Sequence, residues 1–167
     1  MNMNHRSLCL ALLLGVSSVG GAQSKAHTHG EATLDIGIEG RRGTLVFRAP
    51  AEDLYGFERA PRTSAERTAQ LAVLNVLRSQ PASLVRFDAA LGCSLTAETV
   101  GVVEEKGGHG DVQARYTVDC RVPPAGRPMT FAFSKAFPGV RTVKVQLVSD
   151  TAQVGTTITN DRGSVRP

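Results

Sequence analysis

The sequence predicts an α+β domain in which a mainly antiparallel sheet packs against one principal helix. Several segments alternate apolar and polar residues with the period of a half-buried strand. Only the segment at about residues 63–80 has an unbroken apolar pattern of helical length. The strands outnumber the helix and follow one another through short turns, which favours antiparallel pairing with the helix on one face.

The first 22 residues have the composition of a secretory signal peptide. Arg6 supplies a positive charge, residues 8–16 are apolar, and small residues lead to Ala22, where we expect cleavage. This apolar run is shorter than the roughly 20 residues that a membrane span needs. We therefore expect an exported protein with one domain over residues 23–159 and a polar, frayed tail over residues 160–167.

A β-hairpin is the first predicted element of that domain. Residues 32–38 alternate strictly between apolar and polar side chains. The glycine-flanked segment 40–43 supplies a turn, and residues 45–49 continue the apolar face on the returning strand. Pro50 ends this second strand.

A loop and the principal helix follow the hairpin. Residues 51–61 fit neither period, so we expect an ordered loop. Thr63 and Glu66 have the spacing of a capping box, in which each side chain satisfies a free backbone donor of the other. The helix is predicted to begin there and to end before Pro81. Three side chains are expected to attach the loop to the core: Leu54, Tyr55 and Phe57.

The remaining predicted elements are mostly strands. Residues 112–122 alternate clearly and place Cys120 on the apolar side, whereas residues 93–103 alternate less clearly. Residues 129–133 fit a strand or a helix. A second hairpin is predicted within residues 143–158, with its turn around residues 149–152.

Charge and motifs exclude several classes of function. The 19 Lys and Arg residues are scattered among 15 Asp and Glu residues. Without a basic stripe or an aromatic stacking platform, nucleic acid is not an expected partner. No later segment is apolar for long enough to insert stably in a membrane. Because no nucleophile with a base can be named, a secreted hydrolase is the weakest alternative, and no enzymatic activity is expected.

Two cysteines remain after the predicted cleavage, because Cys9 leaves with the signal peptide. Cys93 and Cys120 are then the only possible internal pair. We expect a disulfide between them in an oxidising compartment. The alternative is a pair of thiolate metal ligands, but the close Cys-x-x-Cys spacing of such sites is missing.

The histidines suggest a metal site. If the first strand extends back to His27, then His27, His29 and Asp35 lie on its polar face. His109 and Asp111 have the matching phase at the start of a later strand. Imidazole nitrogens and carboxylate oxygens suit zinc. We predict His27 and His29 as primary zinc ligands, completed by His109, Asp111 or Asp35. The alternative is a solvated polar segment near the processed N-terminus.

Five short motifs resemble a known family. They are residues 27–36, which begin with His-Thr-His-Gly, residues 50–61, which end with Gly-Phe-Glu-Arg-Ala-Pro, Gly-Cys-Ser-Leu (92–95), Tyr-Thr-Val-Asp-Cys (116–120) and Phe-Pro-Gly (137–139). Together they resemble the ZrgA-like zinc-uptake accessory proteins of the bacterial periplasm, over nearly the whole processed chain. The resemblance implies a non-enzymatic periplasmic protein that helps capture scarce zinc beside a zinc-importing transporter or its binding protein.

Two features differ from the family pattern. Members of the family typically have histidine at the position of Arg59, and many have a histidine-rich loop where this chain offers only His109. A cation at position 59 would repel a metal ion if it pointed into the site. The alternative function is therefore an exported interaction module that contacts a transporter or envelope partner without binding metal.

Overall fold

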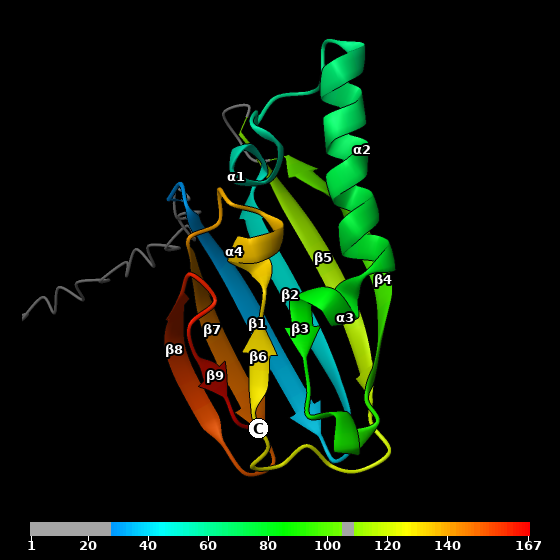
Figure 1. Cartoon of the computed structure of the whole chain (residues 1–167), viewed down its shortest axis with the longest axis vertical. Helices are drawn as coiled ribbons and strands as arrows, with labels where there is room; N and C mark the ends of the chain where they lie inside the picture. The colour runs from blue at the N-terminus through cyan, green and yellow to red at the C-terminus, as the bar shows by residue number, and fades with distance from the viewer. Residues whose placement is uncertain (1–27, 105–108) are drawn as a thin grey trace, which may run out of the picture.

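Strands dominate the computed structural model, which describes residues 28–104 and 109–167 (Figure 1). The six strands of the large sheet are β1 (Glu31–Glu39), β2 (Arg42–Pro50), β4 (Ser94–Glu104), β5 (Gly110–Asp119), β7 (Thr142–Ser149) and β8 (Gln153–Thr159). Its spatial order is β4-β5-β2-β1-β7-β8. A small sheet has the order β3-β6-β9 and consists of β3 (Val85–Arg86), β6 (Met129–Phe131) and β9 (Ser164–Val165).

Four α-helices and one 3-10 turn complete the described elements. They are α1 (Ala51–Tyr55), α2 (Ser64–Ser79), α3 (Pro81–Leu84), α4 (Phe133–Ala136) and the 3-10 turn η1 (Ala89–Leu91). With one long helix and a mainly antiparallel sheet, the predicted α+β class is confirmed. No helix of the described residues is long and apolar enough to cross a membrane. The predicted signal peptide, residues 1–22, lies outside the described residues.

Both predicted hairpins are present in the large sheet. β1 pairs antiparallel with β2, and β7 pairs antiparallel with β8. The two hairpins join through β1 and β7, which run parallel with Leu34 opposite Val145. This parallel pair places β1 at the centre of the sheet.

One face of the large sheet forms the core. Alternate residues of its strands are buried there, including Leu34, Leu45 and Tyr116. The small sheet, α3 and α4 cover this face (Figure 1). Phe133 of α4 stacks on Phe47 of β2, with ring centroids 4.4 Å apart. Burial of each such large apolar side chain stabilises the fold by about 1.5–3 kcal/mol.

Helix α2 begins at the predicted capping box. The Glu66 N–H donates to Thr63 Oγ1 at 3.1 Å, and the Thr63 N–H donates to Glu66 Oε2 at 3.2 Å. Leu77 is the buried residue of the helix, and its carbonyl oxygen accepts a hydrogen bond of 3.0 Å from the Tyr116 hydroxyl. Pro81 starts α3 immediately afterwards. The N-terminal half of α2 projects beyond the end of the large sheet (Figure 1).

The predicted disulfide is present between Cys93 and Cys120. It joins the residue before β4 to the residue after β5, and the two cysteines are 27 positions apart in the sequence. The side chain of Cys120 is buried, which agrees with its predicted place on the apolar side of the alternating segment. The bond therefore closes the same end of both strands.

The prediction of a loop over residues 51–61 is wrong for its first five residues, which form α1. Pro50 has φ −54° just before the first turn, a value suited to a helix start, and two acidic residues in that turn favour the helix N-terminus. Gly56 ends the helix with φ +91°. A five-residue helix is too short to produce a recognisable period.

The prediction of a frayed tail over residues 160–167 is also wrong. Ser164 and Val165 form β9 against β6, and Val165 is buried. The Gly126 N–H donates to the Pro167 carbonyl oxygen at 2.6 Å. A two-residue strand with one apolar side chain has no period that the sequence could reveal.

Residues 129–133, which fitted a strand or a helix, take part in both. They form β6 as far as Phe131, and α4 begins at Phe133.

Candidate metal site

The candidate site lies at one end of the large sheet, where β1 begins, β2 passes into α1 and β5 begins (Figure 1). His29, Glu52 and Glu58 each offer one donor atom there, and these atoms lie within 4.8 Å of one another. His29 Nδ1 is 3.7 Å from Glu52 Oε2, and His29 Nε2 is 3.8 Å from Glu58 Oε1. His109 Nδ1 contacts the other oxygen of Glu58, Oε2. The Glu58 carboxylate therefore lies between two imidazoles.

His29 reaches this position through a turn and not through an extension of β1. Gly30 has φ +82°, a conformation that glycine adopts without strain. The Glu31 N–H donates to the Thr28 carbonyl oxygen at 3.1 Å, which closes the turn. The Gly30 carbonyl oxygen accepts hydrogen bonds from the N–H groups of Arg141 and Thr142 at 3.0 and 2.9 Å. The chain thus leaves the line of the strand just before the histidine.

A second glycine allows Glu58 to approach His109. Gly110 follows His109 directly, and a Cβ at Gly110 would lie 2.7 Å from the Glu58 carbonyl oxygen. Only a residue without a side chain permits this backbone contact. The side chain of Glu58 is 12% exposed, whereas those of His29 and His109 are 55% and 57% exposed. Glu58 is therefore the sheltered donor of the site, and the imidazoles face solvent.

The surroundings of His29 are rich in carboxylates. Asp53 lies beside Glu52 on α1, and its Oδ1 is 4.0 Å from His29 Nδ1. Burial raises the pKa of Asp53, while the Gly30 N–H and His29 act in the opposite direction. Three carboxylates at one end of the sheet produce a negative local potential, which favours a divalent cation.

The donor set and its spacing fit zinc. Zinc binds histidine nitrogen and carboxylate oxygen at about 2.0–2.2 Å in a tetrahedral arrangement, so its donors lie roughly 3.3–3.6 Å from one another. An imidazole binds a given ion through one of its two nitrogens, so one donor atom is counted from each residue. Counted in this way, the donor atoms of His29, Glu52 and Glu58 lie within 4.8 Å of one another. Side-chain rotations that shorten these separations would place the three residues on one ion. His109 is a fourth candidate donor nearby, through its contact with Glu58.

The structure separates the other predicted ligands from this group. Asp35 is exposed in β1, opposite Val46 and Gln146, roughly 13 Å along the strand from its first residue. Because the chain turns at Gly30, the polar-face argument that joined Asp35 to His29 does not hold. Asp111 is buried, with its Oδ2 3.5 Å from Arg48 Nε. His27 lies outside the described residues.

Sequence reasoning missed Glu52 and Glu58 as donors. Glu52 belongs to α1, the short helix that was expected to be a loop, and Glu58 follows it by six positions. Adjacent acidic residues such as Glu52 and Asp53 are also common on solvated surfaces. The Gly-Phe-Glu-x-Ala-Pro motif contained the one available signal, because it includes Glu58.

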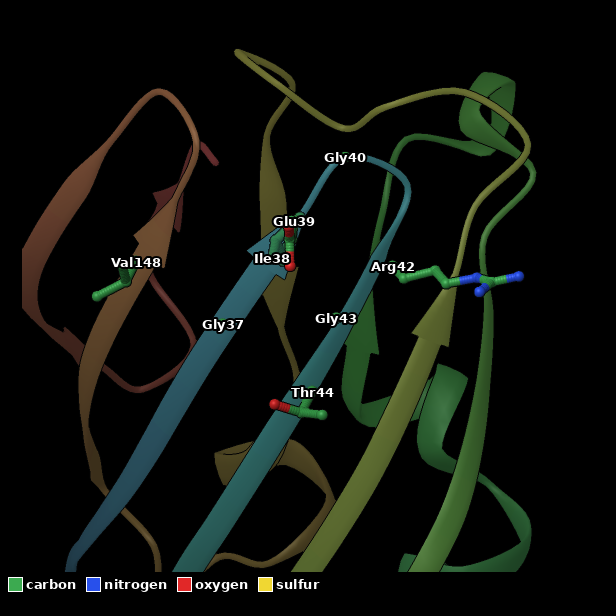
Figure 2. Close-up of a pocket in the computed structure, with 8 residues that line it drawn as sticks. All are labelled: Gly37, Ile38, Glu39, Gly40, Arg42, Gly43, Thr44 and Val148. Carbon is green, nitrogen blue, oxygen red and sulfur yellow. The ribbon is translucent and has the colours of Figure 1, made fainter.

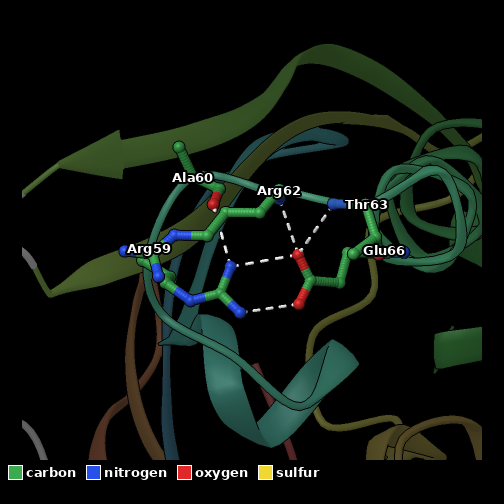
Figure 3. Close-up of polar contacts among 5 residues, drawn as sticks. All are labelled: Arg59, Ala60, Arg62, Thr63 and Glu66. Atoms are coloured by element: carbon green, nitrogen blue, oxygen red, sulfur yellow. Dashed lines mark hydrogen bonds and ion pairs between the residues drawn. The ribbon is translucent and has the colours of Figure 1, made fainter.

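Arg59 is engaged at the start of α2 (Figure 3). Its guanidinium donates to both Glu66 oxygens, at 2.6 and 3.0 Å, and lies 5.6 Å from the centroid of the Phe57 ring. The N–H groups of Arg62 and Thr63 donate to the same carboxylate. Arg59 first, and then these backbone donors, lower the pKa of Glu66 to about 2. The positive charge at position 59 is thus paired with Glu66.

A surface hollow at the opposite end of the large sheet has a different character (Figure 2). Its lining is mostly glycine and apolar side chains around the β1–β2 turn, together with Glu39, Arg42 and Thr44. Arg42 Nε lies 3.6 Å from Asp119 Oδ2. A hollow with a single carboxylate and no imidazole is a poor cation site. The metal donors of the described residues therefore gather at the α1 end.

A family described as "ZrgA family zinc uptake protein" matches residues 26–167, a range that includes all the donors described above. No curated protein matches the chain.

Proposed function

Because the chain belongs to the ZrgA family of zinc uptake proteins, we propose that it binds zinc at the α1 end of its large sheet. The proposed ligands are His29, Glu52 and Glu58. The observation that carries the proposal is the convergence of one imidazole and two carboxylates from separate segments, with their donor atoms within 4.8 Å. His109 is the proposed fourth ligand, through its position at Glu58.

The exposure of the donors supports capture and release over permanent retention. His29 and Glu52 are about half exposed, and Glu58 is the sheltered member of the group. An ion held there would remain accessible to a competing ligand. The proposed role is binding, without a catalytic step.

We further propose that the protein works in the periplasm as an accessory to zinc capture. Family membership supports a role in zinc uptake. The proposed partner is a zinc-importing transporter or its binding protein, which would receive the ion by ligand exchange. The disulfide between Cys93 and Cys120 is compatible with an oxidising compartment.

Isothermal titration of the exported, purified protein with zinc tests the ligand assignment. We expect one zinc ion per chain, and at least a tenfold loss of affinity in His29→Ala and in Glu58→Ala, because each removes a donor. Asp35→Ala is the matched control, since Asp35 is an exposed carboxylate outside the group. Its affinity should equal that of the unaltered protein.

Two results would contradict the proposal. Wild-type binding weaker than about 100 µM would make capture of scarce zinc implausible. Equal affinities in all variants would place the ion elsewhere. Retention of a transporter partner after chelation, together with absent zinc binding, would instead favour the interaction module.

A further inference from the structure

We infer that Asp53 is a positioning residue, which holds His29 in reach of Glu52 and Glu58 without serving as a ligand itself. This inference rests on the proposed zinc site. Asp53 Oδ2 accepts a hydrogen bond of 2.6 Å from the N–H of Gly30, the residue after His29. The acceptor is a carboxylate, so the bond belongs to the strong, charge-assisted class.

The Asp53 carboxylate is well placed for this task because it is sheltered. Its side chain is 9% exposed, whereas that of His29 is 55% exposed. A sheltered carboxylate that accepts the Gly30 N–H can therefore fix the backbone turn that carries His29.

Asp53 is itself held firmly. A Cβ at Gly139 would lie 2.1 Å from the Asp53 carbonyl oxygen, so the backbone of the Pro138–Gly139 turn packs directly on α1. The next residue of α1, Leu54, is buried in the core. Because α1 packs against both this turn and the core, the Asp53 carboxylate that it carries moves little, as a positioning residue requires.

The backbone of Gly30 is held from both sides. Its N–H donates to Asp53, and its carbonyl oxygen accepts from the N–H groups of Arg141 and Thr142, at the start of β7. The Arg141 guanidinium also lies against Gly30, where a Cβ would be 2.5 Å from Arg141 Nη2. Loss of the hydrogen bond to Asp53 would remove one of these restraints on Gly30 and let the turn that carries His29 move away from α1.

Asp53 is distinct from the ligands by its geometry. One oxygen is engaged by the Gly30 N–H, and the other is 4.0 Å from His29 Nδ1. The group of donors that lie within 4.8 Å of one another contains Glu52 but not Asp53. Removal of an outer-sphere partner typically weakens metal affinity roughly 10–100-fold while the ligands remain.

The variants Asp53→Ala and Asp53→Asn test this role in competition titrations with zinc. Asp53→Ala removes the acceptor, and we expect zinc affinity to fall at least about tenfold with one ion still bound. Asp53→Asn keeps an oxygen acceptor for Gly30 and should recover most of the affinity. Unchanged affinity in Asp53→Ala, or equal losses in both variants, would overturn the inference.

A matched control exists at the opposite end of the sheet. Asp150 Oδ2 accepts a hydrogen bond of 2.7 Å from the Gly40 N–H, the same type of bond in a turn outside the proposed metal site. Asp150→Ala should leave zinc affinity unchanged. An equal loss in Asp150→Ala would show a general effect of turn stability and would overturn the specific role of Asp53.

Hydrogen exchange of the Gly30 amide in zinc-free protein separates this inference from the proposed function. We expect faster exchange in Asp53→Ala, near-normal exchange in Asp53→Asn and no change in Asp150→Ala. If the unaltered protein binds no zinc, the proposed function fails, and the Gly30 exchange still decides whether Asp53 holds the turn. Unchanged Gly30 exchange in Asp53→Ala would overturn the inference whatever the zinc affinity.

Discussion

The Glu66 carboxylate links the segment after α1 to the start of α2. It accepts hydrogen bonds from Arg59, Arg62 and Thr63, and thereby completes the capping box while it neutralises a nearby cation. Glu58 of the metal site directly precedes Arg59 in the chain. The same carboxylate that begins the helix therefore also holds the side chain of the residue next to a proposed zinc ligand.

We predict that the stabilisation from Glu66 disappears in acid. Its pKa is about 2 in the folded protein and 4.5 ordinarily, so its contribution is complete above about pH 4.5 and is lost as the pH falls toward 2. Melting temperatures of the unaltered protein and Glu66→Gln should differ at pH 6 and converge near pH 2. Glu98→Gln, at an exposed strand position, is the control. A difference that does not vary with pH would contradict this account.

At the residue scale, contacts between residues close in the sequence were predictable, whereas contacts between distant residues that the fold brings together were not. The Thr63 and Glu66 capping box is encoded within four positions, so its spacing alone predicted it. His29 was also predicted as a donor. Its partners Glu52 and Glu58 were missed because the chain brings them to His29 through a turn at Gly30, and no periodicity specifies that turn.

Among the elements, β5 and the segment after α1 depend on close backbone contact. Gly110 at the start of β5 leaves just enough room for the Glu58 carbonyl oxygen. Gly101 in β4 has no neighbouring atom within 4 Å of the position a Cβ would take. The two glycines belong to paired strands of the same sheet, and only one of them is required by packing.

We therefore predict that Gly110→Ala and Gly101→Ala differ in stability. In Gly110→Ala the new methyl group meets backbone, which cannot rotate away, and the free energy of unfolding should fall by about 1–3 kcal/mol. Gly101→Ala should be neutral or slightly stabilising, because alanine reduces the freedom of the unfolded chain. Urea denaturation of both variants measures the difference. Equal midpoints would show that the segment after α1 moves to accommodate the methyl group.

The strands divide into those with a local signature and those without one. Residues 32–38 and 112–122 alternate over enough positions to be assigned from the sequence. The first range lies within β1, and the second lies in β5 as far as Asp119, where that strand ends. β3 and β9 have two residues each, which is too few for any period. The parallel pairing of β1 with β7 has no local signal, since it depends on which strand edges remain free after the hairpins form.

At the scale of the whole molecule, the disulfide is a covalent link between distant segments of the described chain. It ties the beginning of β4 to the end of β5, while the other end of this strand pair bears His109. A cross-link over 27 positions restricts the unfolded chain more than the folded one. The chain-entropy relation gives a stabilisation of about 3.5 kcal/mol for such a loop.

Reduction of this bond should accordingly lower the free energy of unfolding by about 3.5 kcal/mol. Urea titrations with and without reductant give the two midpoints. The Cys93→Ala/Cys120→Ala double variant is the control, because its midpoint should not respond to reductant. A reductant-independent midpoint in the unaltered protein would contradict the prediction.

The parallel pairing of β1 with β7 also affects when the parts of the chain can pair during synthesis. These strands come from opposite ends of the described chain, and the turn that bears His29 is bonded to Arg141 and Thr142 at the start of the pair. A polypeptide that emerges from the ribosome, or threads through a translocation pore, presents β1 long before β7. Pairing over such distances also slows folding. The turn that carries His29 therefore cannot make its bonds to Arg141 and Thr142 until that part of the chain has been synthesised.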